Sequence, residues 1–264
     1  MRWTSEAEAL LKRVPFFVRG RVRRAVEEWA KERGYSEITA ELLLRAKSEL
    51  KEKASSPDEG YSVERCMGCK NALCDLTALC DRVEDFLREQ DLTGFLRERV
   101  GGRLKYHNQF RVAMSACPNA CSRVQIADFG VIATAKLFFD RDSCDGCAKC
   151  EEVCVDGAIV LKDGVPELIE DRCLRCGACA GACPGGAIRV EQVGYRVLVG
   201  GKLGRHPRLA AEVEGFASED MVLELLRRVV EFYKRHCEGG ERLGTIIQRL
   251  GLSGAEHRVF QSNQ

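Results

Sequence analysis

The sequence lacks the features that mark membrane, secreted and strongly charged proteins. No apolar run reaches the roughly 18 residues that a membrane-spanning helix needs. The N-terminus, MRWTSEAEALL, has neither the basic-then-apolar order nor the cleavage site of a signal peptide. The 41 basic and 40 acidic side chains leave a net charge of +1. The overall charge therefore favours neither a nucleic acid nor a membrane as a partner.

Cysteine, in contrast, is abundant, and 14 of the 15 cysteines fall between Cys66 and Cys183. Eight of them form two runs with the spacing Cys-x2-Cys-x2-Cys-x3-Cys, and Pro184 closes the second run. This spacing is typical of bacterial ferredoxins, in which the fourth cysteine of each run binds the other 4Fe–4S cluster. We therefore predict two clusters, one held by Cys144, Cys147, Cys150 and Cys183, and the other by Cys173, Cys176, Cys179 and Cys154.

Two such clusters make electron transfer the predicted function. Disulfides or a single zinc site are the alternatives, and the cluster spacing disfavours both. Cysteine-rich secreted scaffolds are usually small and lack paired runs of this kind. Thiolates kept free for iron predict a reducing, anaerobic cytoplasm. The near-zero net charge and the lack of a long apolar run predict no nucleic acid and no membrane as partners.

Charge is unevenly distributed along the chain. Residues 12–24 hold six basic and no acidic side chains, whereas residues 140–171 hold ten acidic and three basic ones. Both segments are compatible with an ordinary solvated surface. The functional alternatives are an anion-binding helix face for the first segment and an acidic docking face for an electron-transfer partner for the second.

The hydrophobic pattern predicts where helices and strands lie. Residues 3–53 have the periodicity of three short helices, the third capped by Thr39, and residues 54–60 have the composition of a linker. An apolar segment follows each cysteine run, at 158–173 and 187–194, as a hairpin strand would. Further predicted elements are strands at 110–114 and 129–135, a strand and Gly-rich turn at 195–204, and a helix from Met221 to about His236 that Ser218 caps.

The flanking segments, 62–140 and 191–262, contain several short motifs. They are Tyr106-His107, Phe110-Arg111-Val112, Ser115 to Cys121, Ala127 to Val131, Val199 to Gly204 and Gly240-Glu241-Arg242. By these residues the segments resemble the iron–sulfur and siroheme half of the sulfite and nitrite reductases, in the form of the anaerobic sulfite reductase subunit that carries a ferredoxin insertion. The resemblance implies an α+β fold, in which residues 141–190 are a two-cluster ferredoxin domain inserted into an α/β half.

The resemblance also implies a third 4Fe–4S cluster. In that family, a Cys-x5-Cys pair and a Cys-x3-Cys pair hold the cluster, and the last cysteine bridges to the siroheme iron. Cys117 and Cys121 match the second pair, so Cys121 would be the bridge. The candidates for the first pair are Cys74 and Cys80, which have the right spacing and are preferred. Cys69 with Cys74 is also compatible with the local sequence, so Cys69 and Cys66 remain alternatives for the two positions.

Two further residues have roles implied by the same family. Arg111 falls where the family tends to place a basic residue near the bound oxyanion, and His107 lies close to it in sequence. We take both as candidate catalytic residues. The alternatives are an ordinary strand-edge charge for Arg111 and a surface or core imidazole for His107.

The N-terminal segment, residues 1–54, is predicted to be a separate helical module. Residues 3–48 resemble the C-terminal module of a subunit of dark-operative protochlorophyllide reductase, which also pairs an iron–sulfur cluster with an anionic tetrapyrrole. By this resemblance Arg19, Arg23 and Arg24 are candidates for binding tetrapyrrole carboxylates. The matching residues are Trp3, Ala7-Glu8, Leu11 to Arg19, Arg23-Arg24, Glu27, Ala30, Tyr35, Ile38-Thr39 and Glu41.

Two functions are compatible with these residues. In the first, the chain passes electrons through two ferredoxin cubanes to a third cluster and on to a redox partner or a tetrapyrrole. We find no counterpart of the lobe that family members carry ahead of the first cysteine pair, which favours this function. In the second, the chain is a siroheme-dependent oxidoreductase of sulfite, nitrite or another small oxyanion, completed by a partner lobe, a reductase subunit or self-association. A DNA-binding redox regulator rests only on the basic segment 12–24 and is weakly supported.

Overall fold

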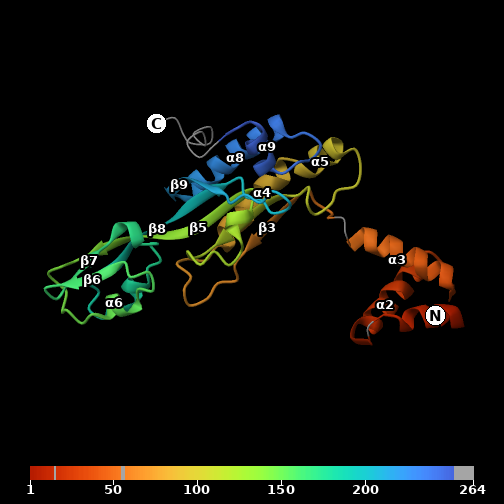
Figure 1. Cartoon of the computed structure of the whole chain (residues 1–264), viewed down its shortest axis with the longest axis horizontal. Coiled ribbons are helices and arrows are strands. Elements are labelled where there is room, and N and C mark those ends of the chain that lie inside the picture. Colours follow the sequence, from red (N-terminus) through yellow and green to blue (C-terminus); the bar gives the residue numbers. More distant parts are fainter. Residues whose placement is uncertain (15, 55–56, 253–264) are drawn as a thin grey trace. The chain divides into compact units, whose positions relative to one another are not determined.

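The computed structural model describes residues 1–14, 16–54 and 57–252, which divide into two compact units (Figure 1). The first unit comprises Met1–Asp58 with Arg103–Tyr106, and the second comprises Glu59–Gly102 and His107–Gln264. Residues 55 and 56 of the predicted linker lie outside the described residues. The end of the predicted reductase-like segment, from residue 253 onward, also lies outside them.

The first unit consists of three helices and a short parallel strand pair. The helices are α1 (Ser5–Lys12), α2 (Phe16–Glu32) and α3 (Ala40–Ala54), and β1 (Arg2–Trp3) pairs with β2 (Glu37–Ile38). The Thr39 hydroxyl accepts a hydrogen bond from the backbone N–H of Leu42, which confirms the predicted cap. The buried core of this unit is formed by Ala7, Val26, Trp29, Ala30, Ile38, Leu43 and Ala46.

The second unit is organised around a mixed five-stranded sheet in the order β3-β4-β5-β8-β9. Its first three strands run parallel and its last two pair antiparallel. The strands predicted at 110–114 and 129–135 are both present, and the second continues to residue 139. The strands are β3 (Tyr61–Arg65), β4 (Phe110–Ser115), β5 (Phe129–Phe139), β8 (Ile188–Val199) and β9 (Ala211–Ala217).

Strand β8 unites two segments that the sequence predicted as separate strands. Gly194 lies in the middle of the strand, opposite Thr134 of β5. A Cβ atom at this glycine would lie 2.7 Å from the ring of Phe216, so the missing side chain makes room for that ring. The strand therefore continues through the glycine instead of ending there. Its first part pairs with the outer part of β5 and forms no hairpin of its own.

Four helices pack against this sheet or beside it: α4 (Thr77–Glu89), α5 (Leu92–Val100), α8 (Glu219–His236) and α9 (Leu243–Arg249). Helix α8 contacts β5, β8 and β9, and its buried Tyr233 lies 5.2 Å from the ring of Phe110, between centroids. The Ser218 hydroxyl accepts from the N–H of Met221, as predicted for the cap of this helix. No helix among the described residues is long and apolar enough to cross a membrane.

The chain between β5 and β8 forms a small insertion that contains both cysteine runs. Its elements are α6 (Lys149–Val153), the hairpin of β6 (Ile159–Lys162) and β7 (Val165–Leu168), and α7 (Ala178–Ala182). The hairpin predicted from residue 158 is confirmed by the pairing of Ile159 with Leu168. In Figure 1, β6, β7 and α6 lie at the outer end of the ribbon that β5 and β8 form.

A buried carboxylate connects the sheet to the C-terminal helices. Asp128 precedes β5 and is fully buried. It accepts hydrogen bonds from Arg242 Nε at 2.7 and 2.9 Å, from the N–H of Leu243 at 3.1 Å and from the N–H of Arg111 at 2.8 Å. Burial raises the pKa of Asp128, and the guanidinium and the two backbone donors oppose that shift. One side chain thus holds β4, the start of β5 and the start of α9 together.

We expect Asp128→Asn to lower the free energy of unfolding by about 3–5 kcal/mol, because Arg242 would keep its charge without a counter-ion. Chemical denaturation under anaerobic conditions measures this loss. Glu64→Gln is the matched control, because Glu64 and its partner Arg123 have side chains that are 49% and 68% exposed. The control change is expected to cost less than about 1 kcal/mol. Equal losses in the two variants would contradict the role given to Asp128.

Candidate functional site

The two cysteine runs of the insertion fold in the same way. In each run the third cysteine lies on a five-residue helix, Cys150 on α6 and Cys179 on α7. The fourth cysteine, Cys154 or Cys183, caps the C-terminus of the same helix. All four belong to, or pack against, one small apolar core. The repeat in the sequence is therefore also a repeat in the backbone.

One cavity in the insertion brings cysteines of both runs together. It is lined by Cys144, Cys147 and Cys150 of the first run and by Cys183 of the second. The β6–β7 hairpin contributes Leu161 and Pro166 to the same wall. The fourth cysteine of the second run thus joins three cysteines of the first, as the ferredoxin spacing predicts.

The other four cysteines of the insertion are also neighbours. Burial raises the pKa of the Cys173 thiol, and the nearby groups of Glu170, Cys176 and Cys154 raise it further. Burial raises the pKa of Cys179 to about 11, and the thiols of Cys176 and Cys173 add to the shift. Cys154 of the first run therefore lies near the three cysteines of the second run.

A third group of cysteines lies where two parallel strands end. Cys66 follows β3 directly, and Cys117 follows β4 after one intervening residue, Ala116. The two strands are neighbours in register, with Arg65 opposite Met114. The N–H of Cys66 donates to the carbonyl of Met114 at 3.0 Å, and the N–H of Ala116 donates to Cys66 Sγ at 3.2 Å. Parallel pairing therefore places Cys66 beside the Cys117 loop.

Cys117 has three cysteine neighbours. Burial raises the pKa of its thiol, and Cys69, Cys121 and Cys66 raise it further. Cys117 is buried, whereas Cys69 and Cys121 are exposed. Strand pairing places Cys66 beside the Cys117 loop, and Cys69 and Cys121 are near enough to act on the Cys117 thiol.

The cysteines that the sequence favoured as the first pair lie in different surroundings. Cys74 is near Cys66, and its Sγ lies 3.9 Å from the hydroxyl of Tyr195. Cys80 is buried on α4, and its Sγ lies 3.9 Å from Oε1 of Glu84 on the same helix.

A left-handed residue precedes one cysteine in each of the four loops, a feature that spacing alone did not predict. Gly68, Ala120, Gly146 and Arg175 have φ angles of 80°, 50°, 71° and 54°, and they precede Cys69, Cys121, Cys147 and Cys176. This conformation costs a non-glycine residue about 1–2 kcal/mol and is retained mainly where function requires it. The sequence signal for it was the Cys-x-Gly-Cys pattern at 66–69 and 144–147.

Backbone N–H groups point at several of these sulfurs. Such hydrogen bonds stabilise the thiolate and tune the potential of an iron–sulfur cluster. No three His, Cys, Asp or Glu side chains of the described residues converge closely enough to hold a single metal ion. The donors to sulfur are Ala116 to Cys66, Ala158 to Cys154, Arg175 to Cys173 and Ile188 to Cys183, at 3.2–3.4 Å.

Cationic side chains collect around the Asp128 network. Burial lowers the pKa of Arg111, and the charges of Arg242 and Arg123 lower it further. Arg242 also donates to the carbonyl of Gly201, and the next residue, Lys202, is only 8% exposed. The sequence had singled out Arg111, which lies in this group, whereas His107 is exposed.

Arg208 lies beside Lys202, in the cationic group around Asp128, and the sequence did not predict a role for it. Its backbone pairs with that of Lys202 in an isolated bridge. Its Nε atom is buried and has no hydrogen-bond partner among the described residues. A buried donor of this kind requires an acceptor, and an anion would supply one.

In the first unit, two of the three candidate arginines are engaged with the unit's own groups. Arg19 donates to the carbonyls of Val14 and Lys12. Arg23 pairs with Glu8 at 2.7 Å and lies over the ring of Trp3.

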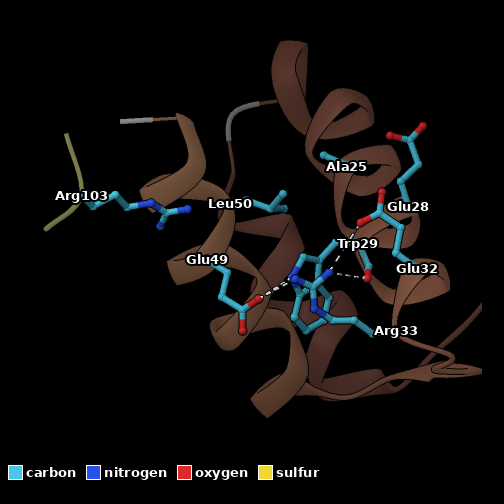
Figure 2. Close-up of a pocket in the computed structure, with 8 residues that line it drawn as sticks. All are labelled: Ala25, Glu28, Trp29, Glu32, Arg33, Glu49, Leu50 and Arg103. Carbon is cyan, nitrogen blue, oxygen red and sulfur yellow. Dashed lines mark hydrogen bonds and ion pairs between the residues drawn. The ribbon is translucent and has the colours of Figure 1, made fainter. Parts of the chain in front are cut away.

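Figure 2 shows a pocket of about 280 Å³ in this unit, whose lining does not include Arg19, Arg23 or Arg24. Trp29 and Arg33 both donate to Glu49 there, at 2.9 and 3.0 Å. Because Glu28 and Glu32 also line it, the pocket is poorly suited to an anionic carboxylate.

The mixed sheet, the cysteine loops at its edge and the two-run insertion together define a protein of the iron–sulfur reductase class. Residues 65–260 match the family described as the nitrite and sulphite reductase 4Fe-4S domain. The chain therefore belongs to this family, whose domain carries an iron–sulfur cluster. Residues 3–47 match the family described as the proto-chlorophyllide reductase 57 kD subunit. Both resemblances predicted from the sequence are confirmed.

Two relatives extend over most of the chain. The coenzyme F420-dependent sulfite reductase of Methanocaldococcus jannaschii is 30% identical over 185 residues, which are 69% of this chain and 27% of that protein. An anaerobic sulfite reductase subunit of Salmonella typhimurium is 28% identical over 217 residues, which are 78% of this chain and 59% of that relative. The chain thus spans only part of the length of either relative.

The N-terminal segment is similar to a further protein, and the fold is similar to that of a solved structure. A light-independent protochlorophyllide reductase subunit of Chloroflexus aurantiacus is 65% identical over 48 residues, which are 18% of this chain and 9% of that relative. Among solved structures, a dissimilatory sulfite reductase I superimposes with a TM-score of 0.56 and 18% identity, covering 86% of this chain and 59% of that one. The shared fold confirms the predicted α+β class.

Proposed function

We propose that this chain is an electron-transfer protein that holds three 4Fe–4S clusters and passes electrons through two ferredoxin-type clusters to a third. A redox partner, a reductase subunit or a tetrapyrrole would then accept them, in a reducing cytoplasm. The proposal is supported by the cavity that joins Cys183 of the second run to three cysteines of the first, and by the parallel strands that place Cys66 beside the Cys117 loop. We assign twelve cysteines to three groups of four, one for each cluster. The groups are Cys144, Cys147, Cys150 and Cys183; Cys173, Cys176, Cys179 and Cys154; and Cys66, Cys69, Cys117 and Cys121.

The residues of each group fit an iron–sulfur cluster. Burial raises the pKa of Cys117, Cys150, Cys173 and Cys179, so a thiolate at these positions needs a cation beside it. Iron supplies that charge, and a bound cluster stores and releases single electrons. The chain's own part is to hold the sulfurs, to donate backbone N–H groups to them and to keep water from the buried ones.

For the third cluster, we assign Cys66 and Cys69 as the first pair and leave Cys80 out, while Cys74 also lies near Cys66. The loop from Cys66 to Cys69 has the left-handed residue before its second cysteine that both insertion loops have. Both of its thiols are close enough to Cys117 to shift its pKa. In contrast, the groups that shift the pKa of Cys80 after burial are Glu84, Arg65 and Asp81.

Iron and acid-labile sulfide analysis of anaerobically purified protein tests this assignment. We expect about 12 iron atoms per chain for the unaltered protein and about eight for Cys69→Ser, because each cubane holds four irons. Cys80→Ser is the matched control and should retain about 12. If Cys80→Ser lost a cluster and Cys69→Ser kept all three, the first pair would be assigned wrongly.

A second function, siroheme-dependent reduction of sulfite, nitrite or another small oxyanion, is favoured by a separate observation. The buried Nε of Arg208 lacks an acceptor among the described residues, and Lys202, Arg242 and Arg111 lie in the same cationic surroundings. A bound siroheme would supply carboxylates and a metal that binds the oxyanion. Cys121 is exposed, so its sulfur could also face such a group. Because the chain spans only part of its relatives, a partner lobe, another subunit or a second copy would complete this site.

A visible spectrum after co-expression with siroheme synthesis tests the second function. A bound tetrapyrrole gives a Soret band and a band in the red, whereas cubanes alone give a broad brown shoulder. We expect Arg208→Leu to lose the tetrapyrrole bands, because the buried donor would be gone. The exposed Arg205 lies on the same loop, and Arg205→Leu should retain them. Absence of these bands from the unaltered protein would rule the second function out.

A further inference from the structure

We propose that Leu73 and Gly177 form the junction between the insertion and the third cysteine group, so that the two ferredoxin-type centres act in series. The centre held by the Cys173 group is then the inner one, and the centre held by the Cys144 group is the outer one. This proposal rests on the three-cluster function proposed above and adds the order of the centres.

Two loops that lie far apart in sequence are in direct contact. Gly177 follows Cys176 and has a φ of +75°. A Cβ atom on Gly177 would lie 2.8 Å from Cδ2 of Leu73, closer than such atoms approach one another. The Leu73 side chain therefore rests on the bare backbone of the Cys173 loop. A larger residue at position 177 would displace the Leu73 side chain from this contact.

The same leucine also forms a hydrogen bond to the loop of the third cysteine group. The N–H of Leu73 donates to the carbonyl of Ala116 at 2.8 Å, and Ala116 is bonded to Cys117. The path from Cys176 to Cys117 thus consists of covalent bonds, one van der Waals contact and one hydrogen bond. Strand β5 holds the loop in place, because the N–H of Ala135 donates to the carbonyl of Arg175 at 2.9 Å.

The Cys144 group has different neighbours. Its cavity is closed by Leu161 and Pro166 of the β6–β7 hairpin. A Cβ atom on Gly146 would lie 3.2 Å from the carbonyl oxygen of Gly164, which is in the turn of the same hairpin. This group thus faces the insertion's own β6–β7 hairpin, which lies at the outer end of the β5–β8 ribbon (Figure 1). The Cys173 loop, in contrast, contacts Leu73 at Gly177.

The order determines where an electron enters and where it goes. A reduced, low-potential one-electron donor protein would deliver it at the Cys144 group. In the step across the junction, the centre of the Cys173 group is oxidised by one electron and the centre of the Cys117 group is reduced by one. No bond forms or breaks, and no proton moves.

Electron paramagnetic resonance of dithionite-reduced protein tests the order, because neighbouring paramagnetic clusters broaden each other's signals. Cys147→Ser removes the outer centre, and we expect the remaining two to keep their mutual broadening. Cys176→Ser removes the inner centre, and we expect the loss of that broadening, since the remaining two are not neighbours. Broadening that is lost in Cys147→Ser, or retained in Cys176→Ser, would overturn the order.

Iron analysis of the same samples distinguishes a failure of this proposed order from a failure of the proposed three-cluster function. About 12 irons in the unaltered protein together with the wrong broadening pattern would refute the order alone. About eight irons would refute the third cluster, and with it both proposals.

Rapid-freeze electron paramagnetic resonance, which follows the reduction of the third centre with time, tests the role of Leu73. In the unaltered protein we expect a fast phase of this reduction. We expect Leu73→Ala to keep its full iron content but to lose that fast phase. Leu174→Ala is the control, because Leu174 lies in the same cysteine loop as Gly177 and is 46% exposed. It should keep the fast phase. A fast phase that survives in Leu73→Ala at full iron content would overturn the junction.

Discussion

The antiparallel pairing of β5 with β8 is the constraint on which the arrangement of the second unit depends. The ladder runs from Phe129 opposite Val199 to Phe139 opposite Ile188. At one end the N–H of Gly200 donates to the carbonyl of Asp128, whose side chain holds Arg242. At the other end the insertion begins and returns. Because one ladder carries both ends, the insertion stays attached to the sheet that holds the third cysteine group.

In the proposed function, folding of the cysteine loops is coupled to metal binding. Thiols whose pKa burial raises are poor anions until a cation compensates them, so cluster assembly and the final packing of these loops would depend on each other. Backbone geometry prepares for this, since Ala120 and Arg175 keep a left-handed conformation that glycine adopts at Gly68 and Gly146. The left-handed conformation has a local energetic cost in these loops, which binding of the proposed clusters would offset.

Spacing along the chain predicted the grouping of the insertion cysteines, because a short loop and one helical turn determine where such sulfurs point. It could not choose the first pair of the third group, because the nearness of Cys66 to Cys117 comes from two strands that pair in parallel. For the same reason, the contact of Asp128 with Arg242, 114 positions later, and that of Leu73 with Gly177 were invisible in the sequence. The predicted strand break at Gly194 was wrong, since only the folded protein shows the ring of Phe216 above it.

We have proposed that three separate groups of cysteines each hold a cluster. Anomalous diffraction at the iron absorption edge, from crystals grown without oxygen, would locate the iron. We expect three strong peaks per chain, one of which lies among Cys66, Cys69, Cys117 and Cys121. Two peaks, both confined to the insertion between β5 and β8, would contradict this proposal.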